Sequence, residues 1–222
     1  MLHLVIADAE LETIPEQMLE DPSIRRFAKK RNKRIDRIIL DSNYMHTAID
    51  RYFPNESKRR GRPDIIYLLL EMTQESILNH KNQLRTYIHT RNNQVIHISP
   101  ITRMPKSYNR FIGLFEDLFE KRIITNNGKK LLSMEDSNLR DLIDSIRRDR
   151  TILLHPKGEM KKPSEFIDRS DILVIIGGFS EGDFLSDISF VQERYAIFDQ
   201  ELTIWSVANE MVASYERAIG LT

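Results

Sequence analysis

The chain has 222 residues, and 41% of them are hydrophobic, which suffices for a packed core and argues against wholesale disorder. It contains no cysteine, which excludes disulfide bridges, thiolate metal sites and cysteine nucleophiles. Basic and acidic residues are balanced at 33 each, so the net charge does not point to a nucleic-acid partner. No apolar run approaches the roughly 20 residues of a membrane span, and no basic leader opens the sequence. We therefore expect a cytoplasmic protein without a membrane partner.

Runs that favour strands and runs that favour helices alternate along the first half of the chain. Strands are expected at residues 2–7, 35–40, 84–90 and 94–98, and the short asparagine-containing connection between the last two indicates a hairpin. Helices are expected at residues 10–19, 44–52 and 65–78. Pro22 is expected to end the first helix, and Asp41 or Ser42 to cap the second.

The alternation continues in the second half, where helices are expected at residues 107–119, 138–146 and 163–168 and strands at 129–133 and 151–154. A turn at residues 126–128 precedes the first of these strands. This order argues for an α/β fold with a mainly parallel sheet, in one domain over residues 1–222. The segments near 40–62 and 81–98 are expected to be additions to its core.

The most informative stretch begins with a run, residues 172–176, that is apolar at every position and predicts a strand buried on both faces. Gly177, Gly178 and Gly182 follow it and permit a tight turn and the close approach of a ligand. In open α/β sheets the ligand crevice lies outside the carboxyl ends of the strands, where these glycines are expected. A helix over 204–219, with Thr203 as its candidate cap, comes next. The alternative is that the glycines only form a turn and bind nothing. Their spacing is not the dinucleotide fingerprint, which argues against a nicotinamide-dependent oxidoreductase.

Basic residues gather in two places. Residues 25–37 contain eight lysine or arginine side chains against one acid, and residues 58–62 hold four more basic side chains. Such clusters suit the phosphate backbone of RNA, and they are equally compatible with a solvated surface. We expect both to contact RNA weakly and without sequence preference.

Two smaller groups carry candidate chemistry. Arg62 and Asp64 are separated by one proline, so the carboxylate can hold the guanidinium for recognition of a base or phosphate; alternatively, Asp64 only caps a helix. Arg103, Lys106 and Arg110 are spaced to converge on an RNA backbone, or to form a solvated basic face. The six histidines show no metal-ligand spacing, and no hydrolase or kinase motif is present.

Taken together, these segments resemble a known family. GRPDIIY (61–67), ISPITRMPKSYNRFIGLFEDL (98–118), IGGFSEGDF (176–184) and AIFDQELTIWSVANEM (196–211) occur in the order found in SPOUT-class rRNA methyltransferases. The resemblance is to the Nep/Emg ribosome-biogenesis family, in an archaeal-type form, and covers nearly the whole chain. These enzymes methylate N1 of a pseudouridine in small-subunit rRNA.

The resemblance implies an α/β knot, with a deep trefoil at the C-terminal end that binds S-adenosylmethionine. It also implies a homodimer that acts on small-subunit rRNA without a metal, with ribosomal proteins or assembly factors as further partners. Trp205 and Met211 are candidates for the dimer face. Two rival functions remain: an RNA-binding assembly factor in which methylation is dispensable, and a SPOUT enzyme acting on tRNA.

The resemblance also assigns site residues. Those that match the cofactor-binding positions of the family are Leu153 or Leu154, Gly177, Gly182, Ile197, Phe198, Asp199, Gln200, Glu201 and Leu202. The run Gln200-Glu201-Leu202-Thr203 departs from the Tyr-Pro-Leu-Ser of eukaryotic members, which a loop that binds through its backbone tolerates.

The RNA-contacting positions match Arg62, Arg103, Lys106 and Arg110. Lys106 stands where other members have an arginine. The lysine keeps the positive charge for a phosphate but cannot bind it through two parallel hydrogen bonds. Arg62 and Asp64 are the expected catalytic pair: Arg62 stabilises negative charge on a flipped base, and Asp64 orients Arg62 or relays the proton.

Overall fold

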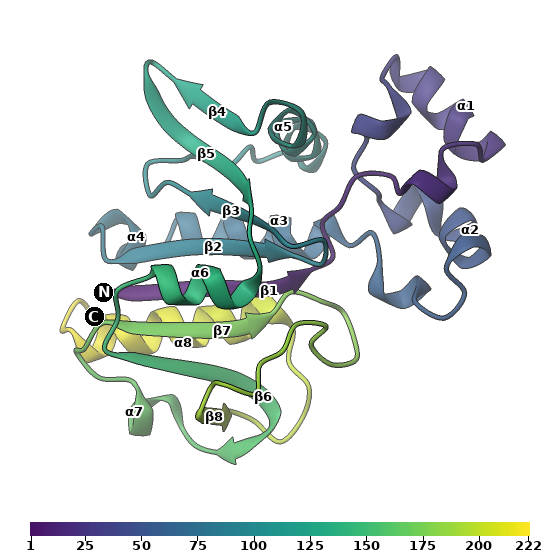
Figure 1. The fold of residues 1–222 in the computed structure, drawn as a ribbon. Coiled ribbons are helices and arrows are strands. Elements are labelled where there is room, and N and C mark those ends of the chain that lie inside the picture. The colour runs from purple at the N-terminus through teal and green to yellow at the C-terminus, as the bar shows by residue number, and fades with distance from the viewer.

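The computed structural model describes residues 1–222 and is built around one eight-stranded sheet with helices on both faces (Figure 1). Across the sheet the strands are β4 (Ile123–Asn126), β5 (Lys129–Asp136), β3 (Gln94–Ile98), β2 (Leu84–Thr90), β1 (Leu2–Ala9), β7 (Ile172–Gly177), β6 (Arg150–Met160) and β8 (Glu193–Ala196). The half from β2 to β8 is parallel, and β3, β5 and β4 continue it antiparallel. The expected α/β class is confirmed.

The central strand β1 is buried along its whole length, which explains its mostly apolar sequence, with His3 and Asp8 as the polar exceptions. Successive side chains point to opposite faces, so Leu4 and Ile6 join the main core while Val5 and Ala7 join a second one. The main core lies under the helices α3 (Pro63–Gln74), α4 (Ile77–His80), α5 (Tyr108–Lys121) and α8 (Ile204–Ala218). The second core lies under α6 (Leu139–Ser145), and α7 (Pro163–Phe166) packs against α8.

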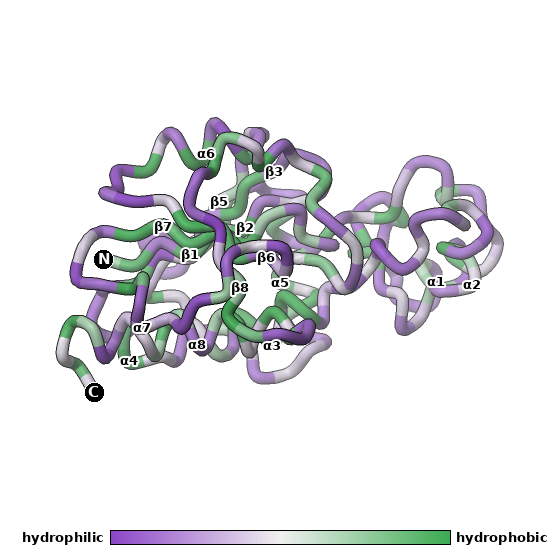
Figure 2. The backbone as a smooth tube through the Cα atoms, turned by 90° about the horizontal axis from the view of Figure 1, so that it is seen from below, coloured by the Kyte–Doolittle hydropathy of each residue, from purple (hydrophilic) through white to green (hydrophobic).

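A separate helical lobe follows β1, and both views show it set apart from the sheet (Figures 1 and 2). It contains α1 (Pro22–Arg31), α2 (Ser42–Tyr52) and the single 3-10 turns Glu16–Met18, Ile35–Arg37 and Ser57–Arg59. Nine buried side chains between Ile14 and Ile49 give the lobe a small core of its own. The independent cluster therefore starts earlier in the chain than the addition expected at 40–62.

Three sequence predictions fail inside this lobe. The helix expected at 10–19 is an extended segment with one 3-10 turn, because Pro15 has no N–H to donate within a helix. The strand expected at 35–40 pairs with the sheet nowhere and forms one isolated bridge between Thr13 and Ile39. Pro22 starts a helix instead of only ending one: Asp21 caps α1 by accepting from the backbone N–H of Ser23 at 2.8 Å.

The β2–β3 hairpin has the expected antiparallel register, but it is no addition to the core. β2 pairs in parallel with β1 from Leu2 beside Leu84 to Ala9 beside Thr90, so it is an interior strand of the sheet. The long helix expected at 65–78 breaks between Gln74 and Ile77, where Ser76 caps the short helix α4.

Both chain ends lie at one end of the sheet (Figure 1). The N-terminal amine contacts the carboxylate of Asp171 and the hydroxyl of Tyr215, which joins β1 to the C-terminal helix. None of the helices combines the length and the apolar character that crossing a bilayer requires.

Candidate active site

A cavity of about 480 Å³ lies at the carboxyl end of β7 and beside residues 154–157 of β6, where the pairing of β6 with β7 has ended. Its walls come from three segments that are far apart in the sequence: residues 154–157 of β6, the loop after β7 and the stretch before α8. The lining residues are Leu154, His155, Pro156, Lys157, Ile176, Gly177, Phe179, Ser180, Glu181, Gly182, Asp183, Phe184, Tyr195, Ala196, Ile197, Phe198, Gln200, Glu201, Leu202, Ile204 and Val207. This is the edge at which open α/β sheets bind ligands.

Strand geometry separates the two leucines that the sequence left as alternatives. Leu154 lines the cavity, whereas Leu153 points to the opposite face of the sheet and is fully buried in the second core. Consecutive residues of a strand point to opposite faces, so only one of the two side chains can reach the cavity.

The two expected glycines form the rim of the cavity. A Cβ on Gly177 would lie 2.6 Å from the ring of Phe179, so a larger residue there would require this ring to move. Gly182 has φ +85°, a conformation that favours glycine, and its Cβ would lie 2.9 Å from Nη1 of Arg59. Both glycines line the cavity, and each leaves room for a neighbouring side chain, Phe179 at Gly177 and Arg59 at Gly182.

The segment before α8 lies along the cavity as expected. Five of its six predicted residues line it: Ile197, Phe198, Gln200, Glu201 and Leu202. The exception is Asp199, which is not among the lining residues. Because the segment is irregular, its backbone N–H and C=O groups are not all used in secondary structure and can bind a ligand.

Arg62 and Asp64 form the bidentate pair that the sequence predicted. Nε and Nη2 of Arg62 each donate to one Asp64 oxygen, both at 2.9 Å. This hydrogen bonding raises the pKa of Arg62, so the guanidinium stays charged. Asp64 lies in the first turn of α3, and its side chain holds Arg62 instead of capping the helix. The pair is about one-third exposed, at 35% for Arg62 and 29% for Asp64.

The other three predicted cations lie next to α3 at the start of α5. Nζ of Lys106 is 3.0 Å from a carboxylate oxygen of Glu71, and Nη1 of Arg103 is 3.4 Å from Glu75. Arg110 is exposed and makes no ion pair. All three cations remain accessible, and two of them are partly neutralised by α3 when no RNA is present.

Glu10 connects the cation group to the cavity. Its backbone C=O accepts from the N–H of Arg62 at 3.1 Å, and its own N–H donates to the C=O of Gly178 at 3.0 Å. One strand end thus places the start of α3 beside the loop that borders the cavity. The Arg62–Asp64 pair and the ligand cavity are therefore linked through the residue that follows β1.

A model of the EMG1/NEP1 methyltransferase family matches residues 4–216. The chain belongs to this family. It is 88% identical to a protein of Thermoplasma acidophilum and 76% identical to one of Thermoplasma volcanium, each named ribosomal RNA small subunit methyltransferase Nep1, over 100% of each chain. A crystal structure of Archaeoglobus fulgidus Nep1 bound to S-adenosylhomocysteine has 32% identity, a TM-score of 0.88 and 98% coverage of both chains.

In this EMG1/NEP1 chain, the cavity also contains a polar group that the sequence did not reveal. Nε2 of His155 lies 2.9 Å from Oδ1 of Asp183, and Nζ of Lys157 donates to Oδ2 at 3.1 Å. The hydrogen bond from His155 is the largest cause that lowers the pKa of Asp183 well below its ordinary range. His155 and Asp183 are 28 residues apart, so no local spacing could have identified the pair.

The basic run at 25–37 divides into two halves with different tasks. Arg31 donates to both oxygens of Glu116 at 2.6 and 3.1 Å, and Lys33 also contacts this buried carboxylate. Arg37 contacts Glu120 on the same helix, α5. These side chains dock the lobe onto α5 and are not free to bind RNA.

On α1, Arg26, Lys29 and Lys30 are exposed and form no ion pair. Their spacing of three and four residues places them on one helix face. They are the half of the run that remains available to a phosphate backbone.

The second basic run is mostly turned inward. Nη1 of Arg60 lies 2.7 Å from the buried Glu12, and its guanidinium covers the ring of Phe53 at 3.9 Å. Arg59 is directed at Glu10. Only Lys58, with 78% of its side chain exposed, remains at the surface beyond Arg62. Charge counting in the sequence therefore overstated the surface that this run offers to RNA.

Histidine, aspartate and glutamate side chains form no group of three or more that is arranged to hold a metal ion.

Proposed function

We propose that this protein is an S-adenosylmethionine-dependent methyltransferase that modifies N1 of a pseudouridine in small-subunit rRNA and takes part in small-subunit biogenesis. The observation that carries the proposal is that backbone hydrogen bonds through Glu10 join Arg62, which is paired with Asp64, to Gly178 in the loop that borders the cavity. The full-length similarity to rRNA methyltransferases and to a Nep1 bound to S-adenosylhomocysteine supports it.

The cavity suits this cofactor. Gly177 and Gly182 border it without side chains of their own, Leu154 offers an apolar wall, and residues 197–202 offer backbone groups for the polar parts of the molecule. When bound, the cofactor supplies a methyl group on a positively charged sulfonium, which is already reactive. The protein then has mainly to position the base and to keep water away.

Arg62 acts on the target base in this proposal. Loss of the N1 proton leaves negative charge on the base, and a guanidinium fixed by two hydrogen bonds stabilises that charge without having to reorganise. Asp64 keeps Arg62 in place or relays the proton.

Arg103, Lys106 and Arg110 hold the RNA backbone around the target. The exposed face of α1 adds a nonspecific electrostatic contact at a distance from the site, since the lobe is set apart from the sheet (Figure 1). The rRNA substrate also favours the cytoplasmic location expected from the sequence.

We further propose a homodimer with its interface next to the cofactor segment. A hollow of about 590 Å³ is lined by residues of α3, α8 and the segment 197–202. Leu68, Phe198 and Leu202 are exposed there at 43%, 51% and 41%, and Trp205 also lines the hollow. A second copy would cover these apolar side chains. Met211 is fully buried in the main core, so only Trp205 of the two expected residues is available to an interface.

Threading of the C-terminal segment into a trefoil remains part of the proposal. It is supported by the path of the chain: β8 pairs with the outer side of β6, and α8 then returns to cover β1 and β7. Contacts with ribosomal proteins or assembly factors also remain part of the proposal.

The deciding experiment uses labelled S-adenosylmethionine and one small-subunit rRNA hairpin made twice, with uridine or with pseudouridine at the loop target. Label on the pseudouridine hairpin alone is the expected result. Tight binding of both hairpins without label would favour an assembly factor, and label on a tRNA in a parallel reaction would favour a tRNA-modifying enzyme.

A further inference from the structure

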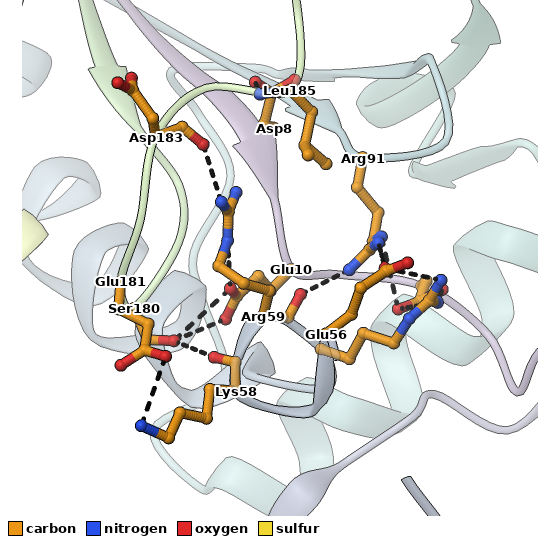
Figure 3. Close-up of polar contacts among 12 residues, drawn as sticks. Asp8, Glu10, Glu56, Lys58, Arg59, Arg91, Ser180, Glu181, Asp183 and Leu185 are labelled. Atoms are coloured by element: carbon orange, nitrogen blue, oxygen red, sulfur yellow. Dashed lines mark hydrogen bonds and ion pairs between the residues drawn. The ribbon is translucent and has the colours of Figure 1, made fainter. Parts of the chain in front are cut away.

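The loop that borders the cavity after β7 has no strand or helix of its own between residues 178 and 192. It is held instead by charged side chains from two other parts of the chain, shown in Figure 3: Asp8 at the end of β1, and Arg59 at the exit of the helical lobe. Neither residue lines the cavity. Their function is not explained by contact with cofactor or RNA.

Asp8 holds the far side of the loop. One of its oxygens accepts from the backbone N–H groups of Leu185 at 2.7 Å and Ser186 at 3.0 Å, and the other accepts from the Ser186 hydroxyl at 2.6 Å. The side chain is only 1% exposed, and burial alone would raise its pKa. The hydrogen bonds from His89 and Ser186 outweigh burial and lower the pKa of Asp8, so the carboxylate is charged.

The backbone of Asp8 is unusual as well, with φ +54°, the left-handed region. Its N–H lies 3.3 Å from Nδ1 of His89, and Nε2 of the same ring lies 3.0 Å from Oδ1 of Asn93. The strand therefore turns out of its regular path at this residue, and the register with β2 shifts between Ile6 and Ala9. The turn aims the carboxylate at the loop.

Arg59 holds the near side. Nη1 donates to the backbone C=O of Asp183 at 2.7 Å, and the guanidinium lies 4.2 Å from the centre of the Phe179 ring. Nε lies 3.3 Å from the buried carboxylate of Glu10. Arg59 also occupies the space that a side chain at position 182 would need.

Asp8 and Arg59 thus enclose the segment from Phe179 to Ser186, which contains Gly182. We propose that both are positioning residues for the cofactor: they hold this segment in the shape that borders the cavity. The inference rests on the proposed cofactor site. An anchored loop loses less conformational freedom when a ligand binds, so the anchors strengthen binding without touching the ligand.

The test measures S-adenosylhomocysteine binding by calorimetry for the full chain and for Asp8→Ala, Asp8→Asn and Arg59→Met. Asp8→Ala removes all three accepted hydrogen bonds, so we expect affinity to fall by about tenfold or more, since bonds to a charged acceptor are among the strong ones. Asparagine tolerates the left-handed backbone and retains a carbonyl acceptor, so Asp8→Asn should stay within about threefold of the unchanged protein. Methionine keeps the apolar length beside Phe179 and removes the donor to Asp183, so Arg59→Met should also lose about tenfold.

The matched control is Asp187→Asn on the same loop. The Asp187 carboxylate is hydrogen-bonded by the nearby Ser189 and by no other residue, so loss of its charge should leave affinity unchanged. In methyl transfer, Arg59→Met should raise the KM for S-adenosylmethionine while kcat at saturating cofactor stays within about twofold of the unchanged enzyme.

The outcomes separate this inference from the cofactor assignment. If the unchanged protein does not bind S-adenosylhomocysteine, the proposed site is wrong. If it binds while Asp8→Ala and Arg59→Met bind equally well, the site stands and the positioning role is wrong. If Asp8→Ala does not fold, Arg59→Met decides: unchanged S-adenosylhomocysteine affinity, or a fall in its kcat with an unchanged KM, contradicts the proposal.

Discussion

Replacing Arg62 by lysine tests the proposed chemistry most directly, because lysine keeps the positive charge but cannot donate two parallel hydrogen bonds to one carboxylate. Two N–H groups of Arg62 now bond the two Asp64 oxygens at 2.9 Å, and a lysine can retain one of these bonds. A hydrogen bond between charged groups contributes about 1.5 to 3 kcal/mol. The side chain is 35% exposed, so water compensates for part of the loss, and we expect a cost of about 1 to 2 kcal/mol.

If that cost falls on the transition state, kcat decreases by about 5- to 30-fold, since about 1.4 kcal/mol corresponds to tenfold in rate. Steady-state methylation of the pseudouridine hairpin at saturating substrate measures kcat, and filter binding of the same hairpin measures RNA affinity. RNA affinity should change by less than about threefold, because one phosphate-binding charge is retained. A variant with unchanged kcat and weakened RNA binding would show that Arg62 only binds the backbone.

Asp64→Asn complements this variant. It removes the charge that fixes Arg62, and it also removes any proton relay through the carboxylate. An Asp64→Asn enzyme with full turnover at every pH would exclude Asp64 from both roles.

Three further predictions concern the cofactor loop, the lobe and the sheet. Gly182→Ala places a side chain at φ +85° against Arg59, so the free energy of unfolding in urea should fall by about 1 to 2 kcal/mol. Calorimetry should show a parallel loss of S-adenosylhomocysteine affinity. Equal affinity would contradict the proposed position of Gly182 at the rim of the cavity. Charge reversal of Lys29 and Lys30 should reduce the slope of log RNA affinity against log salt by about 1 to 2, and an unchanged slope would show that this face does not bind RNA. Burial lowers the pKa of His3 from 6.5 to about 4, so only the unfolded chain takes up this proton between those values and stability should decrease as the pH falls through that window, by at most about 3 kcal/mol. His3→Gln should flatten this part of the stability profile in pH-dependent unfolding, and an unchanged profile would assign the effect to other groups.

Most regular elements of this fold could be predicted from the sequence because they depend on local patterns. The apolar runs of β1 and β7, the capped helix α2 and the spaced apolar face of α8 lie close to where they were expected. The predictions for residues 10–19 and 35–40 were wrong. Both segments contribute to the small core of the lobe, where packing overrides local preference.

The candidate site divides in the same way. The Arg62–Asp64 contact was predictable, since both residues lie within one turn and are separated by a proline. The roles of neighbouring basic residues were not predictable: Arg59 and Arg60 turn inward to buried carboxylates, whereas Lys58 stays in solvent. A sequence gives the charge of a side chain, but not the partner that lies opposite.

The sequence by itself determined the fold class, the family resemblance and the segments that border the cavity. Each of these depends on continuous runs of residues. Only the tertiary structure decided which face of β6 reaches the cavity, so that Leu154 lines it and Leu153 does not. It also brought His155 to Asp183, and Asp8 to Leu185 and Ser186 across 177 and 178 residues of chain. Such contacts depend on how the strands are ordered in the sheet, and this order is fixed by the packing of the whole core.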